Sequence, residues 1–318
     1  PIEERVAPFT LPSPERPLAP PLLRLEDVNI GYGDRTVLKG LNLRLDEDDR
    51  IGLLGVNGVG KSTFAKLVAQ ALPLQAGHMH RDRRMKVGWF HQHQIEALDP
   101  NDTALEIIRR AMPEASESSR RSRLAQFGLG FDKQETTVAN LSGGERARLL
   151  LNLVAMDAPH LLILDEPTNH LDIDSRRALL DALNEYEGAV ILITHDRSLM
   201  ELVADRLWLA DAGAIRPFEG DMNDYAKFVL DRARSAASGK KVAPPAPPPP
   251  AAPKVSPSTL RRRLEEAEKA LAKATSVVAE IDRQLADPKT YALPAKISEL
   301  QKRRVPAQAA LDAAESAW

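Results

Sequence analysis

The segment "RIGLLGVNGVGKST", residues 50–63, joins a strand-like run to a helix-like run through a glycine-rich loop. The loop carries the pattern G-x-x-x-x-G-K-S, formed by Gly55, Gly60, Lys61 and Ser62. Glycines there allow backbone N–H groups to wrap phosphate oxygens, Lys61 neutralises those oxygens, and Ser62 offers a hydroxyl to Mg²⁺. We therefore predict a nucleoside triphosphate site at this loop.

A second motif, "HLLILDEP" at residues 160–167, ends an apolar strand pattern with two carboxylates. Asp165 is expected to hold the Mg²⁺ shell, and Glu166 is expected to polarise the attacking water. Both motifs occur in the strand contexts that this chemistry requires. The sequence therefore predicts hydrolysis as well as binding.

Composition sets the class of protein. The chain has 318 residues, of which 43% are hydrophobic and 28% charged, so it can bury a full core and a second module. No apolar run reaches the roughly 18 residues of a membrane span. The absence of cysteine excludes disulfides and thiolate metal sites and agrees with a cytoplasmic protein. The formal charge of -2 gives no overall attraction to nucleic acid.

Prolines and periodicity divide the chain into four predicted parts. They are a Pro-rich connector over 1–21, an α/β domain with a largely parallel sheet over 22–236, a Pro-rich linker over 237–258, and a helical hairpin over 259–318. In the second part, helix-like runs alternate with strand-like ones, which are "LLRLEDVNI", "RIGLLG", "KVGWF", "HLLILD", "AVILIT" and "RLWLAD". In the fourth part, apolar residues step by four and three, which predicts an antiparallel coiled coil weakened at Pro306.

The hairpin also carries two basic runs, at residues 261–263 and 302–304. Such runs can contact phosphates. From Ser258 onward, however, 11 Lys and Arg stand against nine Asp and Glu, which favours a solvated coiled-coil face.

A third motif, "LSGGE" at residues 141–145, lies between the glycine-rich loop and the Asp165–Glu166 pair. In this order the three motifs resemble the ATP-binding-cassette superfamily, and the resemblance covers residues 22 to about 230. It implies an ABC-type P-loop fold that binds ATP and Mg²⁺. Five more residues match landmarks of the family: Tyr32 for adenine stacking, Gln92 for sensing Mg²⁺ and the γ-phosphate, Leu171 with Asp172 for dimer contact, and His195 as the switch histidine.

The resemblance also assigns the remaining site residues. Around the phosphates it adds Asn57, Gly58 and Thr63 to the loop residues, and it implies catalytic roles for Lys61, Gln92, Glu166 and His195, with Ser62, Gln92 and Asp165 near the metal. In this family two cassettes pair head to tail. Ser142, Gly143, Gly144 and Glu145 are therefore expected to serve ATP held by a second cassette, either upstream in a longer chain or in a homodimer.

Several features resemble the ABC-F branch, which acts on ribosomes without transmembrane partners. They are the signature ending in Glu145 and the stretches at residues 165–175, 194–200 and 218–228. The arrangement is similar to the second half of a bacterial ABC-F protein of the YheS or Uup type, so a first cassette is expected before Pro1. Two alternatives stay open: a DNA-associated ABC ATPase that uses the hairpin, and the energy subunit of a membrane transporter.

Other histidines have simpler interpretations. His78 with His80, and His91 with His93, have a spacing that suits metal ligation, but there is no cysteine and no carboxylate cluster beside them. We expect them to be polar loop or strand residues. His170 is interpreted as an interface residue, not as a catalytic one.

Overall fold

The computed structural model describes residues 9–169 and 171–237, together with residues 273, 275–277, 280, 281, 283, 284, 302–304, 306 and 307. The chain divides into two compact units, Pro1–Lys254 and Val255–Trp318. The four part boundaries predicted from the sequence remain predictions.

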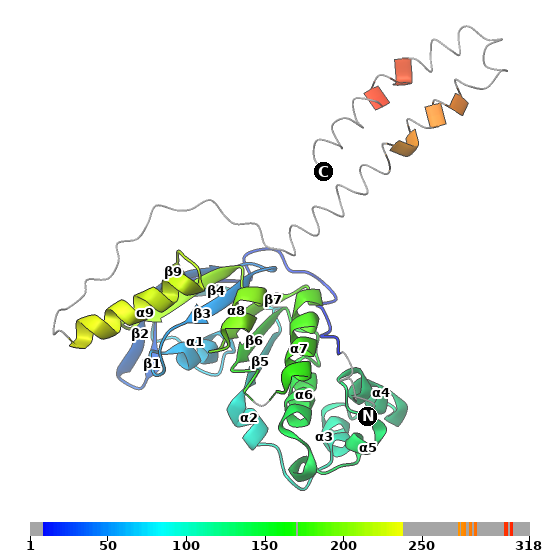
Figure 1. Ribbon diagram of the computed structural model, residues 1–318, viewed down its shortest axis with the longest axis horizontal. Helices are drawn as coiled ribbons and strands as arrows, with labels where there is room; N and C mark the ends of the chain where they lie inside the picture. Colours follow the sequence, from blue (N-terminus) through cyan, green and yellow to red (C-terminus); the bar gives the residue numbers. More distant parts are fainter. Residues whose placement is uncertain are drawn as a thin grey trace. The chain divides into compact units, whose positions relative to one another are not determined.

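The centre of the first unit is a six-stranded sheet with the order β5-β6-β7-β3-β8-β9 (Figure 1). Its strands are β3 (Arg50–Leu54), β5 (Val87–His91), β6 (Leu161–Asp165), β7 (Ala189–Ile193), β8 (Arg206–Asp211) and β9 (Ala214–Phe218). All neighbouring pairs are parallel except β8 with β9. The predicted α/β fold with a largely parallel sheet is confirmed.

Both faces of this sheet are buried, because alternate residues of its central strands enter two different cores. Leu161 and Ile163 join a core that also contains Phe64, whereas Leu162 and Leu164 join a second core on the opposite face. A strand that is covered on both faces has a continuous apolar sequence, which is why strands β6 and β7 could be predicted from the sequence.

A separate antiparallel sheet has the order β2-β1-β4. Its strands are β1 (Leu23–Tyr32), β2 (Arg35–Leu45) and β4 (Ala76–Arg81). Its buried residues and those of one face of the large sheet pack around helix α1 (Lys61–Val68). The glycine-rich loop therefore lies between β3 and a helix that both sheets hold in place.

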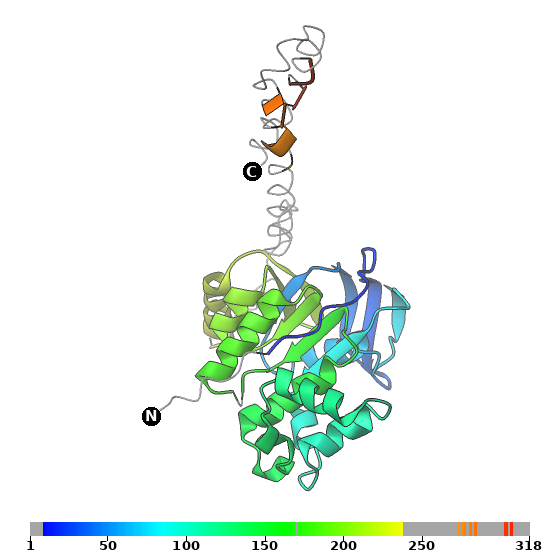
Figure 2. The same cartoon turned by 90° about the vertical axis from the view of Figure 1, so that its right-hand side faces the viewer.

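The remaining helices cover the second face of the large sheet or form a group beside it. They are α2 (Gln92–Glu96), α3 (Ala104–Ala111), α4 (Glu117–Gln126), α5 (Phe131–Gln134), η1 (Val138–Asn140), α6 (Gly143–Val154), α7 (Ile173–Glu185), α8 (Arg197–Val203) and α9 (Met222–Ala237). Helices α6, α7 and α8 supply the second core. Helices α3, α4 and α5 lie together beside the sheet (Figure 2), where buried residues of α3, α4, η1 and α6 form a third, smaller core.

The described part of the N-terminal Pro-rich segment, residues 9–21, packs against the rest of the unit. Phe9 is 4% exposed and stacks on Phe127 at a centroid distance of 5.6 Å. Leu11 and Leu18 are buried, and the Arg16 carbonyl lies 3.0 Å from Nε2 of His160. The segment thus contacts both the helical group and the sheet.

The predicted hairpin over 259–318 falls largely outside the described residues. Those that are described there have helical conformation, and Ile281 is buried. Across the described portion of the chain, no helix is long and apolar enough to cross a membrane.

Candidate active site

The glycine-rich loop follows β3 directly and turns into α1. Gly55 has φ 145°, and a Cβ there would lie 2.6 Å from the Ala210 carbonyl oxygen, so only glycine fits. Gly60 has φ 108° and precedes the first residue of α1, Lys61. The Lys61 ammonium donates to the carbonyls of Gly55 and Val56. The loop is thus folded around its own lysine.

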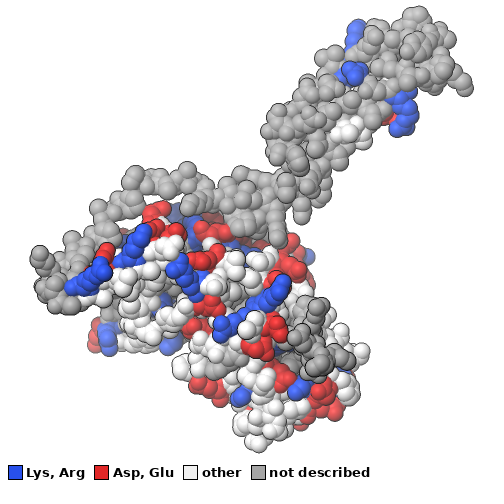
Figure 3. All heavy atoms as spheres, viewed as in Figure 1, with Lys and Arg blue, Asp and Glu red and all other residues white. Residues whose placement is uncertain are grey.

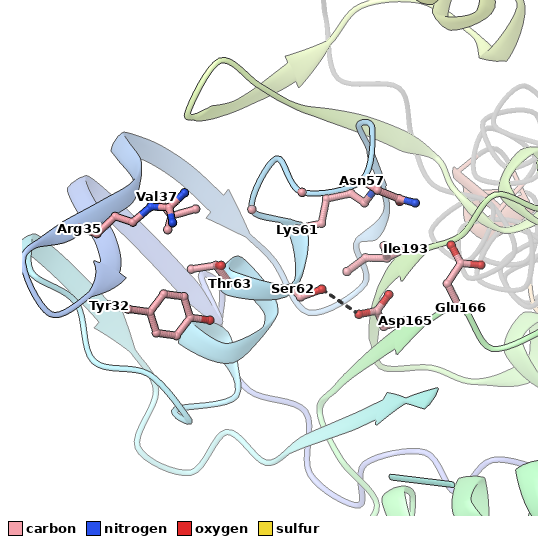
Figure 4. A pocket seen from close by; sticks show the side chains of 12 residues that line it. Tyr32, Arg35, Val37, Asn57, Lys61, Ser62, Thr63, Asp165, Glu166 and Ile193 are labelled. Carbon is pink, nitrogen blue, oxygen red and sulfur yellow. Dashed lines mark hydrogen bonds between the residues drawn. The ribbon is translucent and has the colours of Figure 1, made fainter. Parts of the chain in front are cut away.

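A pocket of about 410 Å³ opens over this loop (Figure 4). It is lined by Tyr32, Arg35, Val37, Asn57, Gly58, Gly60, Lys61, Ser62, Thr63, Asp165, Glu166 and Ile193. Seven of the residues predicted to bind nucleotide line it, together with both predicted carboxylates. Arg35, Val37 and Ile193 were not predicted from the sequence, although the first two lie three and five residues after the predicted aromatic Tyr32 in "GYGDRTV".

Ser62 and Asp165 come from different elements and meet at one side of the pocket. The Ser62 Oγ donates to Oδ2 of Asp165 across 3.4 Å. Burial raises the pKa of the Asp165 carboxyl, and the neighbouring Glu166 carboxylate raises it further. A cation here would offset both effects, and hydroxyl and carboxylate oxygens are ligands that Mg²⁺ accepts. The residues therefore fit Mg²⁺.

Burial also affects Lys61. It lowers the pKa of the ammonium, whereas the carboxylates of Glu166 and Asp165 raise that pKa. A partly desolvated cation attracts phosphate more strongly than one in bulk water.

Glu166 and His195 lie at the carboxyl ends of two neighbouring strands, β6 and β7. Nε2 of His195 is 3.5 Å from Oε1 of Glu166 and 3.2 Å from Oδ1 of Asn57 in the glycine-rich loop. Glu166 has φ 54°, in the left-handed region that β-carbon sterics disfavour, and its N–H donates to the Ile193 carbonyl at 2.7 Å. Backbone strain of this kind concentrates at functional sites.

Gln92 is the first residue after β5 and does not line the pocket. Its Oε1 accepts from Nδ2 of Asn169 at 3.5 Å, and its Nε2 donates to Glu96 at the same distance. Gln92 is therefore connected to the loop that follows Glu166, at the same edge of the sheet as the other site residues.

Tyr32 ends β1 at the far side of the pocket and is 46% exposed. Its hydroxyl accepts from Nζ of Lys66 at 3.0 Å, and this hydrogen bond lowers the pKa of Tyr32. The ring is thus held from α1 with one face available to a flat ligand.

The residues expected to act on a second cassette lie elsewhere, at the start of α6. Ser142 caps this helix: its Oγ accepts from the N–H of Glu145 at 3.1 Å, and its own N–H donates to Oε2 of Glu145 at 2.7 Å. Gly143 and Gly144 form the first turn. None of these four residues lines the pocket of its own chain.

The four histidines considered for metal binding are placed as follows. His78 and His80 are exposed on β4, His91 ends β5, and His93 is exposed on α2. His170 lies outside the described residues. Within the described ranges, His, Asp and Glu form no group of three or more that could hold a metal ion.

The chain is similar in sequence to known proteins over the region that carries these motifs. The family described as ABC transporter matches residues 38–169. YheS of Escherichia coli K12 is 43% identical over 223 residues, which cover 70% of this chain and 35% of YheS. GCN20 of Saccharomyces cerevisiae is 33% identical over 246 residues, which cover 76% of this chain and 32% of GCN20. ATP-binding cassette sub-family F member 3 of Mus musculus is 36% identical over 217 residues, which cover 68% of this chain and 31% of that protein. The chain thus spans about a third of the length of these relatives.

Solved structures agree in fold. The dimeric bacterial ABC transporter cassette MJ0796 superposes with a TM-score of 0.54 at 23% identity, covering 62% of this chain and 99% of that one. A post-hydrolysis dimer of MJ0796 bound to ADP and phosphate gives 0.53 at 24% identity, with the same coverage. The fold and site define an ABC-type ATPase that binds nucleotide. With these relatives, the chain belongs to the ATP-binding-cassette superfamily and to its ABC-F branch.

Proposed function

We propose that this cassette hydrolyses ATP by in-line attack of water on the γ-phosphate, with Glu166 as the base and His195 as its partner. The observation that carries this proposal is the 3.5 Å approach of His195 Nε2 to Glu166 Oε1 beside the glycine-rich loop. A carboxylate and an imidazole at this distance can share one water molecule and orient it.

The other pocket residues have complementary roles in this proposal. Lys61 and the amides of the loop around Asn57, Gly58 and Thr63 bind the phosphates, and Tyr32 stacks on the base. Ser62, Asp165 and Gln92 hold Mg²⁺, which when bound supplies positive charge to the phosphate oxygens. Gln92, to which the family resemblance assigns the sensing of the γ-phosphate, accepts a hydrogen bond from Asn169 in the loop after Glu166.

A complete site is proposed to need a second cassette. Backbone N–H groups in the first turn of α6 have no carbonyl acceptor within the helix. Such groups at the start of a helix can bind an anion. Because Ser142 to Glu145 do not line the pocket of their own chain, we infer that they bind ATP held by a partner cassette. The dimeric MJ0796 cassettes offer a precedent for such pairing.

The partner of the closed pair is proposed to be the ribosome, which is the target of the ABC-F branch and would place the chain in the cytoplasm. Charge on the cassette does not distinguish a DNA partner from ribosomal RNA. On the face seen in Figure 3, basic and acidic side chains are interspersed. Several charged residues of the cassette are ion-paired, as in Arg197–Glu201 and Lys227–Asp224. Nucleic acid binds best to an unbroken positive surface.

The test is co-sedimentation with ribosomes of the chain carrying Glu166→Gln, with ATP and without it, at one moderate salt concentration. Pelleting that requires ATP is the expected result. The matched control adds Lys61→Ala, which should abolish both ATP binding and pelleting. A chain that retains ATP but stays in the supernatant would count against the ribosome, and parallel incubations with duplex DNA and with lipid vesicles would then test the two alternatives.

A further inference from the structure

A buried arginine connects two helices that both begin at the proposed cassette interface. Arg148, in the middle of α6, is 5% exposed, and its Nη2 donates to Oγ of Ser175 at 2.7 Å. Ser175 is 2% exposed and lies in the first turn of α7. The bond is therefore shielded from water along its whole length.

Each of the two residues is tied to a helix start. On α7, Asp172 is the capping residue, and its Oδ1 accepts from the N–H of Ser175 at 2.7 Å. The preceding residue, Leu171, is buried in the second core. Ser175 thus bonds Asp172 through its backbone and Arg148 through its hydroxyl. On α6, Arg148 lies in the same short helix that Ser142 caps.

The energetics indicate a geometric role for Arg148. Its Nε–H has no acceptor among the residues that the structure describes, so the guanidinium is desolvated with incomplete hydrogen bonding. Burial lowers the pKa of Arg148, although the carboxylates of Asp172 and Glu145 act in the opposite direction. A buried charge in this situation contributes little to stability, and an apolar side chain of similar volume often replaces it without loss.

We propose that Arg148 is a positioning residue that joins the Ser142 end of α6 and the Asp172 end of α7 into one rigid docking edge, and that the occupant of this edge is a second copy of the cassette. The inference rests on the proposed shared site. A rigid edge lowers the entropy lost when both helix starts must reach the partner together. Arg148 touches neither ATP nor water in this scheme.

The test uses the full 318-residue chain carrying Glu166→Gln, and compares Arg148→Met, Arg148→Lys and Ser175→Ala. The dimer Kd at saturating ATP is measured by sedimentation velocity, and the ATP Kd of each variant by titration calorimetry. Arg148→Met should weaken the dimer about tenfold and leave the ATP Kd and the thermal midpoint nearly unchanged. Arg148→Lys should recover part of the loss, because an ammonium can still donate to Ser175. Arg148→Met combined with Ser175→Ala should weaken the dimer no more than Arg148→Met alone.

Arg177→Met is the matched control, since Arg177 is an exposed arginine on α7, and it should dimerise like the reference. An unchanged dimer Kd in Arg148→Met, with the reference dimerising normally, overturns the role of Arg148 and leaves the shared site intact. A lowered thermal midpoint that accounts for the whole loss also overturns it, because the residue would then be merely structural. If the Glu166→Gln reference binds ATP but stays monomeric, the shared site itself is rejected, and this inference with it.

Discussion

Nε2 of His195 lies 3.5 Å from Oε1 of Glu166, although 29 positions (195 − 166) separate the two residues in the chain. The distance follows from the sheet: β6 and β7 are parallel neighbours, and Asp165 pairs with Ile193 at their carboxyl ends. The two side chains therefore emerge side by side at the edge where the glycine-rich loop also begins.

Glu166→Gln should reduce kcat by a factor of about 10² or more, because the amide keeps the shape of the carboxylate but cannot accept a proton. The Kd for ATP should change little. Phosphate release under single-turnover and steady-state conditions measures the first quantity, and calorimetric titration the second. Glu219→Gln, at an exposed position, is the matched control. Turnover close to that of the parent chain would remove Glu166 from the mechanism.

His195→Ala should lower kcat by a factor of about 10 to 10² without weakening ATP binding. Oδ1 of Asn57 lies 3.2 Å from Nε2 of His195, so we expect Asn57 to act in part through the imidazole. Combining Asn57→Ala with His195→Ala should therefore cost less in kcat than the product of the two single effects. His80→Ala serves as control, because His80 is an exposed residue of β4. Fully multiplicative effects would show that the two residues act independently.

The strands recognised in the sequence are mostly those buried on both faces. The three that were missed, β2, β4 and β9, are all edge strands. In β4, exposed and half-buried residues alternate through "AGHMHR", and β9 contains Pro217. Edge strands carry polar residues and proline because only one side pairs, so their apolar signal is weak.

Site residues were predictable where a local motif specified them, as for Lys61 and Asp165. Contacts between motifs were not, because they depend on sheet register and helix packing. The hydrogen bonds from Lys66 to Tyr32 and from Arg148 to Ser175 belong to this group. The packing of residues 9–21 against the cassette was also not predicted. The prolines of this segment suggested a connector, whereas Phe9 and Leu11, which lie among those prolines, are core residues.

Tyr32→Ala should raise the Kd for ATP about tenfold, because stacking of a base on an aromatic ring contributes about 1–3 kcal/mol. Tyr32→Phe keeps the ring and removes only the hydroxyl that accepts from Lys66, so its Kd should stay within about twofold of the parent value. Calorimetric titration with ATP measures both. Equal losses in the two variants would mean that the hydroxyl, not the ring face, matters for binding.

Asp205 gives a pH dependence of stability. Burial raises its pKa to about 6, and the carboxylates of Asp48 and Asp49 add to this, whereas the cations of Arg50 and Arg206 oppose it. A carboxyl whose pKa is higher in the folded state destabilises the fold as pH rises from about 4 to about 6, because the folded chain then holds the extra proton. The cost at pH 7 is about 1 kcal/mol once solvent screening of this half-buried group is allowed for.

Asp205→Asn should remove this cost in folding free energy. The difference in free energy of unfolding between Asp205→Asn and the parent should therefore shift in favour of the variant by about 1 kcal/mol between pH 4 and pH 7. Urea denaturation at one-unit intervals measures it, with the exposed Asp34→Asn as control. A difference that is constant over this range contradicts the assignment.

The N-terminal segment should contribute to the stability of the cassette, not merely lead into it. Phe9 is 4% exposed and stacks on Phe127, next to α4 of the helical group. Phe9→Ala removes a buried aromatic ring and leaves a cavity, which typically costs about 3 kcal/mol of unfolding free energy. Urea denaturation at pH 7 gives the value, and Thr10→Ala, one residue away and exposed, should cost less than about 0.5 kcal/mol. Because Phe127 belongs to the helical group, amide exchange around Leu124 and Leu129 should also quicken in Phe9→Ala and not in Thr10→Ala. If both variants match the parent chain in stability and exchange, the segment is a passive connector.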